Sequence, residues 1–274
     1  MSDSPAFRTD LYRGTASYYD RYRLPYPDEL IDDLCRRAGA TRRGRMLDLA
    51  CGPGTVTFAL CDRFEEVWAV DQEREAVEFA AQKAAKLGVE NIRWITGRAE
   101  DVDPAESFDL VTVGTAFHRL DRRCIADLGM QLLRPGGHLA LLWSETALGG
   151  ETEPWRQRYR EIYAEWVERV GATDRLPADF EEHIEQLPHE KVLQDAGFLV
   201  EERYEYAGTH DWTVAELIGL VYSTSLLSRV VLGDRAGEFE TDFEQRMRAV
   251  EPSGVFRGTT SFAYDFATRP VRVT

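Results

Sequence analysis

A short apolar run that ends in a turn of small residues constrains the fold of this chain more than any other feature. Residues 45–49 form the apolar run, residues 50–54 read Ala-Cys-Gly-Pro-Gly, and Thr55 then opens a helical pattern. Glycines in such a turn let the backbone approach a ligand closely, and the free amides of the first helical turn face the same point. The pattern therefore predicts a strand, a turn and a helix, with a ligand at the turn.

A second apolar run, residues 67–70, ends in Asp71, and Gln72 follows it. A carboxylate at the end of the second strand of such a unit can accept hydrogen bonds from both hydroxyls of a ribose. A nucleoside-type cofactor is implied, with Asp71 and Gln72 at its sugar. A helix cap or a surface carboxylate is the alternative for Asp71.

The turn differs from the dinucleotide-binding pattern, because no third glycine follows Gly52 and Gly54. Residues 48–54 instead resemble the glycine loop of class I S-adenosylmethionine-dependent methyltransferases, with Ala50 at the position of the first glycine. The resemblance implies that Ala50, Gly52 and Gly54 face the cofactor. It also implies that Asp48 orients the methionine amino group, although this carboxylate could equally stabilise the loop.

Three further segments match the same family in the same order: residues 97–101, 107–118 and 132–139. The resemblance places Ala99 and Glu100 at the adenine ring, with Arg98 where relatives commonly have aspartate. It places Thr115 and Ala116 against the methionine part of the cofactor, with loop packing as the alternative. The Pro-Gly-Gly sequence in the third segment is typical of a structural turn.

Aromatic residues near the N-terminus resemble the family segment that folds over the methyl donor. Tyr18 and Tyr19 could each present a ring face to the sulfonium, which attracts cations. The alternative is that these rings belong to a helix that packs on the sheet.

His118 is the candidate general base, since it follows the fourth predicted strand and its ordinary pKa suits proton transfer near neutral pH. Contact with the cofactor or acceptor, or a role in ordering its loop, are the two alternatives.

Strand and helix patterns alternate along the chain, which is typical of a parallel sheet covered by helices on both faces. The resemblance implies an α/β, Rossmann-like, seven-stranded and mostly parallel sheet with an antiparallel last strand. The predicted strands are residues 45–50, 66–71, 91–95, 107–113, 138–143, 199–209 and 259–268, and the main helices are 55–63, 73–87, 121–133 and 191–197.

The resemblance also divides the chain. Residues 1–40 are expected to place a helical segment over the cofactor site, although residues 1–10 have the composition of a disordered segment. The methyltransferase core is expected to be formed by residues 41–143, 189–210 and 259–270. Residues 144–188 and 211–258 are expected to be insertions that form a helical cap.

Apolar and aromatic residues recur at helical spacing in both insertions. Because ligands lie at the carboxyl ends of parallel strands, the cap is expected to shape the acceptor pocket. Trp143, Trp155, Tyr159 and Tyr222 are the candidate acceptor-binding residues, and Glu145, which closes the fifth strand together with Trp143, could also touch the acceptor. Simple packing of the cap is the alternative.

The composition excludes several classes. The chain has 274 residues, 43% apolar residues and a net charge of −15, which argues against a nucleic-acid substrate. Four cysteines show no metal-ligand spacing, so we expect no metal. No apolar run approaches the ~20 residues of a membrane span, and no leader pattern is present, so we expect a cytoplasmic protein.

Together these features predict an S-adenosylmethionine-dependent methyltransferase that acts on the O, N or C atom of a small organic molecule. The alternatives are a non-catalytic protein that binds the methyl donor, or an RNA or protein methyltransferase. The oligomeric state is left open.

Overall fold

The computed structural model describes residues 7–103, 105–145, 147, 153–177, 182 and 186–271. Its strands are β1 (Arg45–Leu49), β2 (Glu66–Asp71), β3 (Ile92–Thr96), β4 (Phe108–Gly114), β5 (Leu133–Glu145), β6 (Leu199–Val200), β7 (Tyr204–Thr213) and β8 (Val255–Thr268). Its α-helices are α1 (Ala16–Tyr22), α2 (Asp28–Arg37), α3 (Thr55–Leu60), α4 (Arg74–Leu87), α5 (Arg122–Leu132), α6 (Pro154–Arg169), α8 (His189–Asp195), α9 (Val214–Tyr222), α10 (Arg229–Leu232) and α11 (Ala236–Val250).

The strands form one sheet in the order β3-β2-β1-β4-β5-β8-β6, and β7 also pairs with β8. Strands β1 to β5 pair in parallel, whereas β8 runs antiparallel to β5, β6 and β7. The predicted mostly parallel sheet with an antiparallel last strand is therefore confirmed. The described residues give eight strands rather than seven, because exposed charged residues at 201–203 divide the predicted strand 199–209.

Apolar residues on both faces of the sheet explain the arrangement of the helices. One core packs α5 and α8 against one face, through residues such as Ile125 and Leu193. A second core packs α2 and α3 against the other face, through Leu34 and Leu60. Burial on both faces is what a parallel sheet requires.

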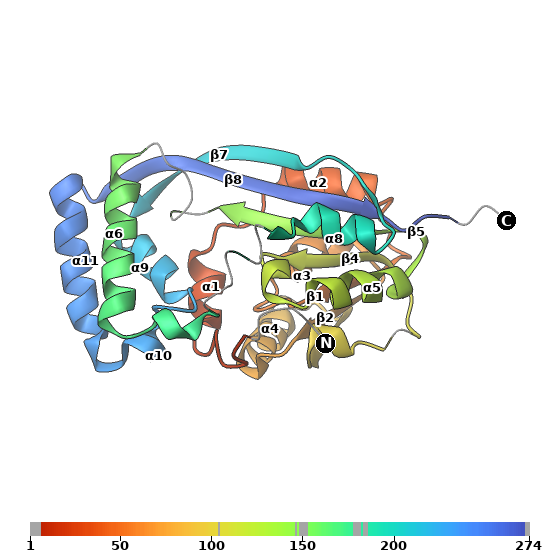
Figure 1. The fold of residues 1–274 in the computed structure, drawn as a ribbon, viewed down its shortest axis with the longest axis horizontal. Helices are drawn as coiled ribbons and strands as arrows, with labels where there is room; N and C mark the ends of the chain where they lie inside the picture. The colour runs from red at the N-terminus through yellow and green to blue at the C-terminus, as the bar shows by residue number, and fades with distance from the viewer. Residues whose placement is uncertain are drawn as a thin grey trace.

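The helices α6, α9, α10 and α11, here called the helical lobe, lie at one end of the molecule beyond the main sheet (Figure 1). They share a third apolar core of their own, built from aromatic residues of α6 and α11 such as Trp166 and Phe243. Strands β7 and β8 form a long pair that reaches from the sheet to this lobe (Figure 1). As a result, residues 211–213 and 255–258 are strand, although the sequence predicted helix throughout 211–258.

One further local prediction needs correction. The Pro-Gly-Gly segment was expected to be a turn before the fifth strand, but β5 already begins at Leu133 and pairs with Phe108. The pairing shifts register between Phe108 and Leu110, and Gly136 has φ +77, so the segment is an irregularity within the strand.

No helix in the described ranges is both long and apolar enough to cross a bilayer.

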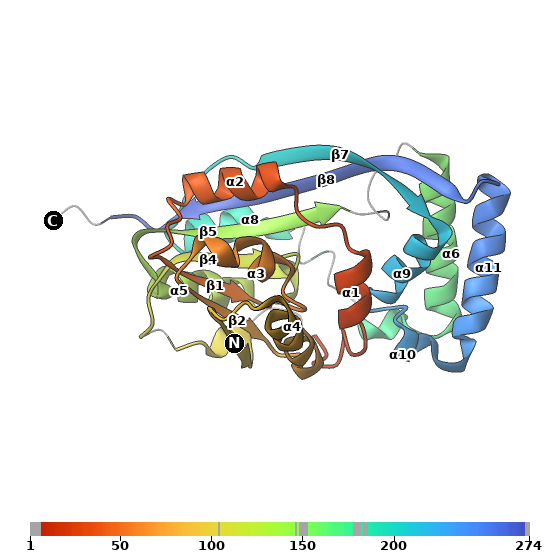
Figure 2. The same cartoon turned by 180° about the vertical axis from the view of Figure 1, so that it is seen from behind.

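Helix α1 joins the lobe to the main sheet (Figure 2). Its Tyr18 ring lies 5.2 Å from the ring of Tyr222 in α9, in an edge-to-face arrangement. Tyr22 covers Gly219 so closely that a Cβ at that glycine would lie 2.3 Å from the Tyr22 ring. The glycine is therefore required for α1 to pack against the lobe.

Replacing Gly219 with alanine is expected to lower the free energy of unfolding by about 1–3 kcal/mol, because the new methyl group overpacks the contact between α9 and α1. Gly237→Ala is the matched control, since Gly237 lies in α11 and its Cβ would meet no atom within 4 Å. That control is expected to leave stability unchanged or raise it by up to about 1 kcal/mol through helix propensity. Urea unfolding checks both variants, and equal effects of the two would contradict the described packing of α1.

Candidate functional site

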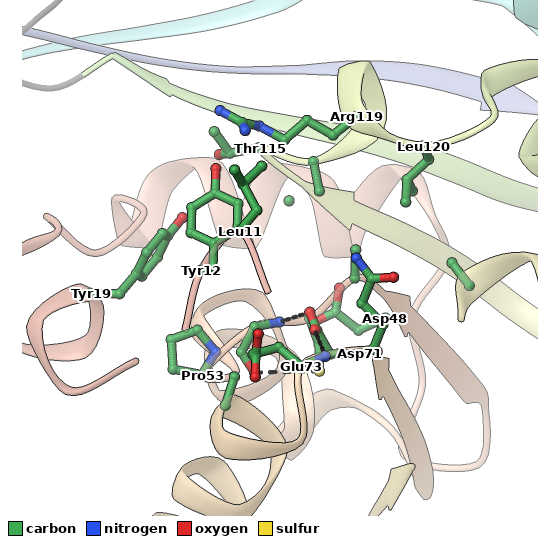
Figure 3. Close-up of a pocket in the computed structure, with 18 of the residues that line it drawn as sticks. Leu11, Tyr12, Tyr19, Asp48, Pro53, Asp71, Glu73, Thr115, Arg119 and Leu120 are labelled. Atoms are coloured by element: carbon green, nitrogen blue, oxygen red, sulfur yellow. Dashed lines mark hydrogen bonds between the residues drawn. The ribbon is translucent and has the colours of Figure 1, made fainter. Parts of the chain in front are cut away.

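A cavity of about 490 Å³ lies at the carboxyl ends of β1, β2 and β4. Residues of the glycine turn, the ends of β2 and β4 and the N-terminal residues 7–19 line it. Its volume is typical of pockets that enclose small ligands. Figure 3 shows the carboxylates of Asp71 and Glu73 on one side of this cavity and Thr115, Arg119 and the hydroxyls of Tyr12 and Tyr19 on the other.

The glycine turn has left-handed backbone at three alternate positions: Ala50 with φ 53, Gly52 with φ 54 and Gly54 with φ 87. Gly52 lines the cavity, and a Cβ there would meet no protein atom within 4 Å, so its missing side chain leaves open space for a ligand. Gly54 does not line the cavity. A Cβ there would lie 2.9 Å from the rings of Phe58 and Trp94, so this glycine is required for packing.

The side chain of Asp71 holds the turn in place. One oxygen accepts a hydrogen bond from the Gly52 amide at 2.7 Å, and the other accepts from the Glu73 amide at 2.8 Å. Burial raises the pKa of this carboxyl, and the two amides oppose that rise. Each oxygen retains a second lone pair, so the carboxylate can still accept hydrogen bonds from a ligand in the cavity.

Asp48 is fully buried beneath the turn. It accepts hydrogen bonds from the hydroxyls of Thr57 at 2.5 Å and Thr112 at 2.9 Å, which fix α3 and β4 to β1. Burial raises the pKa of Asp48 to about 6, against the effect of these hydroxyls. The side chain borders the cavity while supporting the loop, so both alternatives drawn from the sequence are compatible with its position.

The loop after β3 forms a short 3-10 helix, Ala99–Asp101, at the same edge. Ala99 is buried, and Glu100 accepts a hydrogen bond from the Asp121 amide at 3.3 Å. Arg98 is exposed and pairs with Glu100 at 3.5 Å. The Arg98 side chain therefore meets a carboxylate of its own loop, and the loop as a whole borders the cavity.

Thr115 follows β4 and has φ 51, which is rare for a non-glycine residue and concentrates at functional sites. Its hydroxyl lies 3.3 Å from the hydroxyl of Tyr26. Burial raises the pKa of Tyr19, and Arg23 and a hydrogen bond with Thr115 oppose the rise. Tyr19 thus faces the cavity, whereas the neighbouring Tyr18 turns to the helical lobe and does not line it.

Ten of the predicted cofactor residues line this cavity. They are Tyr19, Asp48, Ala50, Gly52, Asp71, Gln72, Ala99, Glu100, Thr115 and Ala116. Tyr18 and Gly54 do not, for the packing reasons given above.

His118 does not line the cavity, although its neighbours in the chain do. Its ring stacks at 6.0 Å from the ring of Trp143, and its Nε2 accepts a hydrogen bond from Arg119 at 3.1 Å. Burial lowers the pKa of His118 to about 3, and the charges of Arg119 and His189 add to this effect. The role of general base stays a prediction that this geometry disfavours, because a base works best with a pKa near the working pH.

The neutral state of His118 has a consequence for acid stability. Its unfolded-state pKa is about 6.5, so below that pH the unfolded chain binds a proton that the folded protein rejects. The stability contributed by the neutral ring is complete above about pH 6.5 and is lost as the pH falls toward 3. The native protein should lose about 1–2 kcal/mol more free energy of unfolding between pH 7.5 and pH 5 than the His118→Asn variant does. Urea unfolding at both pH values checks this, and a constant difference would contradict it.

The predicted acceptor residues do not line the cavity either. Trp143 donates a hydrogen bond to Asp265 at 2.7 Å and stacks on His189 at 5.0 Å. Trp155, Tyr159 and Tyr222 are buried in the core of the helical lobe. The sequence correctly predicted that these three residues lie in helices. Their side chains, however, pack against the other helices of the lobe and not against the cavity.

The hydroxyl groups of the two lobe tyrosines differ. Tyr222 donates a hydrogen bond to Glu240 at 2.6 Å. The Tyr159 hydroxyl is buried and has no partner among the described residues. Glu145, two residues after Trp143, is exposed at the end of β5 and pairs with β8 through Ser261.

Several residues of the cavity were not predicted. They include Phe7, Arg8, Thr9, Leu11, Tyr12, Tyr26, Glu73, Arg119, Leu120 and Asp121. The expectation of disorder for residues 1–10 is wrong for residues 7–10, because three of these line the cavity and Asp10 pairs with Arg8 at 2.9 Å. Residues 1–6 lie outside the described residues. The one sequence feature that could have pointed to any of them is the position of Arg119 and Leu120 in the loop after the fourth strand.

Within the described ranges, no cluster of side chains could hold a metal ion.

Comparison with known proteins identifies the class of this site. A family model described as a methyltransferase domain matches residues 46–137, the segment that carries the glycine turn, Asp71 and the loop at Ala99. Residues 46–137 are therefore a methyltransferase domain of the class I type. The protein is an enzyme that transfers methyl groups, and its cofactor is S-adenosyl-L-methionine.

Individual relatives agree with this class I methyltransferase assignment. An uncharacterized methyltransferase of Mycobacterium bovis is 29% identical over 209 residues, which are 76% of this chain and 73% of the relative. A trans-aconitate 2-methyltransferase of an Azoarcus species is 27% identical over 202 residues, covering 66% of this chain and 76% of the relative. A solved structure of a candidate type II methyltransferase from Anaeromyxobacter dehalogenans, 21% identical, covers 92% of this chain and 100% of its own with a TM-score of 0.63, which shows a shared fold.

The residues of this class I methyltransferase fit the donor. S-adenosylmethionine carries a ribose and two cationic groups, the sulfonium and the amine. The cavity offers open space at Gly52, free lone pairs on Asp71 and a carboxylate-rich wall at Asp48, Asp71 and Glu73. Acceptors of this kind suit the sugar hydroxyls and the positive charges.

Proposed function

We propose that this enzyme methylates a small organic molecule by in-line displacement. The observation that carries the proposal is a single cavity of about 490 Å³ that has both a carboxylate-rich wall and a wall of aromatic and hydroxyl groups. The first suits the donor, and the second gives space for a small acceptor beside it.

The walls of the cavity favour a small acceptor over a polymer. Residues of the N-terminal segment, including Phe7, Leu11 and Tyr12, line the cavity together with residues that follow β4. The net charge of −15 disfavours a nucleic acid, because binding of a polyanion relies on clustered positive charge. One similar protein is named for a small-molecule acceptor, trans-aconitate.

Individual roles follow for the residues that line the cavity. We assign Asp71 and Gln72 to the ribose, Ala99 and Glu100 to the adenine, and the left-handed turn at Thr115 to the methionine part. Tyr19 presents its ring beside the sulfonium, where a cation–π contact contributes about 0.5–2 kcal/mol. The helical lobe contributes indirectly, because it holds α1 and therefore Tyr19 in place.

The donor, when bound, supplies a methyl group on a sulfonium whose leaving group is already good. The main task of the chain is then to hold the acceptor atom in line at roughly 3–3.5 Å, which can contribute about 7–11 kcal/mol. A general base contributes less, about 10²–10⁴-fold in rate. An enzyme with His118 outside the cavity can therefore still be efficient if its acceptor is nucleophilic without deprotonation.

A methyl-transfer assay tests the proposal. The protein is incubated with donor labelled in the methyl group and with three acceptor pools: small metabolites, bulk RNA and bulk protein. Label is expected in the small-molecule pool only, and Asp71→Asn is expected to abolish it. Label in RNA or protein would contradict the proposed substrate class, and donor binding without transfer to any pool would indicate a non-catalytic binding protein.

A further inference from the structure

Arg119 has a nitrogen that the rest of the described chain leaves without a partner. It ends the short 3-10 helix Phe117–Arg119 after β4 and lines the cavity. Its Nε donates to His118 at 3.1 Å, but its Nη1 is buried and has no hydrogen-bond partner among the described residues. Leaving a buried N–H group of a charged side chain unpaired is energetically costly, so a ligand that accepts from it would recover that cost.

A second guanidinium, that of Arg23, lies behind Tyr19. Its Cζ is 5.0 Å from the centre of the Tyr19 ring, and its Nε donates to Ser223 at 2.9 Å. Within the part of the chain that the structure describes, neither Arg23 nor Arg119 forms an ion pair with a carboxylate. Arg119 therefore lines the cavity without a counter-charge, and Arg23 adds a second positive charge behind Tyr19 without lining the cavity.

Hydroxyl groups surround the same end. The guanidinium of Arg119 lies 5.1 Å from the centre of the Tyr12 ring. Figure 3 shows the Tyr12 and Tyr19 hydroxyls directed toward the end where Thr115 and Arg119 lie, away from Asp71. Phenol and alcohol O–H groups can donate to an anion, as a guanidinium can. The cavity thus has carboxylates at the glycine turn and cationic and hydroxyl donors at Arg119, with Asp121 also in its lining.

We propose that Arg119 binds a carboxylate of the methyl acceptor, so that the substrates of this enzyme are small organic acids. The inference rests on the proposed function, since it places the acceptor in the same cavity. A planar guanidinium with a free N–H matches a carboxylate, and charge-assisted hydrogen bonds of this kind are roughly twice as strong as neutral ones. The Tyr12 hydroxyl offers a further donor beside the anion.

The competing anion is the carboxylate of the donor itself, because the methionine part is expected at Thr115. The direction of Arg119 favours the acceptor. Its side chain extends toward Phe7 and Tyr12 of the N-terminal segment, with its Cζ 5.8 Å from the Phe7 ring centre. The experiment below separates the two anions by measuring donor and acceptor binding independently.

Calorimetry on protein saturated with S-adenosylhomocysteine provides the test. Succinate, fumarate, citrate and benzoate are titrated, each beside its uncharged amide. At least one acid is expected to bind at least tenfold more tightly than its amide. Arg119→Gln is expected to weaken that acid at least tenfold and Arg119→Lys to weaken it less, because lysine keeps the charge but not the fork of donors. The affinity for S-adenosylhomocysteine should stay within threefold in both variants.

Arg123→Gln is the matched control, since Arg123 is exposed on α5 and does not line the cavity. It removes the same charge and should leave acid binding unchanged. Equal binding of all acids and amides, or their common failure to bind, would overturn the proposal. A tenfold loss of S-adenosylhomocysteine affinity in Arg119→Gln would overturn it too, by assigning Arg119 to the donor. If native protein does not bind S-adenosylhomocysteine at all, the proposed function itself fails, which is a distinct result.

Discussion

Valine at position 52 is expected to weaken the binding of S-adenosylhomocysteine by at least 100-fold, which corresponds to about 2.7 kcal/mol. A Cβ at Gly52 would meet no protein atom within 4 Å, so the valine side chain would extend into open space at the cavity. That is the space in which the donor is expected to lie against the turn. The variant should still fold, at a cost of about 1–2 kcal/mol for the left-handed backbone. Calorimetry measures the affinity, and urea unfolding measures the stability.

Gly39→Val controls for the backbone strain. Gly39 has φ +58, close to the +54 of Gly52, and its Cβ would also meet nothing within 4 Å. It follows α2 and does not line the cavity. Its valine variant should lose similar stability and keep the affinity for S-adenosylhomocysteine. Unchanged binding in Gly52→Val would show that the donor does not approach the glycine turn.

The second large effect is expected at Asp71. In Asp71→Asn, an amide NH2 group replaces one of the two carboxylate oxygens that accept from the Gly52 and Glu73 amides. One backbone N–H then faces another donor, the turn loses its fixed shape, and the acceptor for the ribose is lost as well. Hydrogen bonds to charged groups contribute about 1.5–3 kcal/mol each, so affinity for S-adenosylhomocysteine should fall at least 100-fold.

Asp62→Asn is a suitable comparison, because Asp62 has a 63% exposed side chain and pairs only at the surface with Arg63. It should change neither affinity nor stability measurably, as is usual for exposed ion pairs. Wild-type affinity in Asp71→Asn would remove this carboxylate from the donor site. It would also indicate that its hydrogen bonds to the turn serve stability alone.

The donor side of the cavity could be predicted because its information is local. The turn at Gly52 and the carboxylate at Asp71 each follow directly from the end of one strand, and adjacent parallel strands bring their carboxyl ends together. The same reasoning located Ala99 and Thr115. It placed Gly54 in the turn correctly but on the wrong side of it. Spacing alone cannot show that this glycine faces Phe58 and Trp94 rather than the cavity.

The acceptor side could not be predicted in this way. Helical periodicity shows that Trp155 and Tyr159 share a face, but not that α9 and α11 cover this face. In the same manner, the sequence shows His118 in the right loop but not that its ring turns toward Trp143. Arg119, its neighbour, reaches the cavity instead. These outcomes depend on contacts between segments far apart in the chain, which local patterns do not encode.

The N-terminal segment illustrates the same limit. Residues 1–10 were expected to be disordered, yet Phe7 and Thr9 line the cavity and the following Leu11 is only 4% exposed. The backbone carbonyl of Leu11 accepts a hydrogen bond from Arg175, which follows α6. Order in this segment therefore comes from a residue more than a hundred positions away in the chain.

The account depends on a single donor site at the glycine turn, and a calorimetric titration of native protein tests it most directly. S-adenosylhomocysteine and NAD are titrated separately under identical conditions. Saturable one-to-one binding of S-adenosylhomocysteine, with no detectable binding of NAD, is the predicted result. Absence of binding by S-adenosylhomocysteine, or equally tight binding of NAD, would contradict the account.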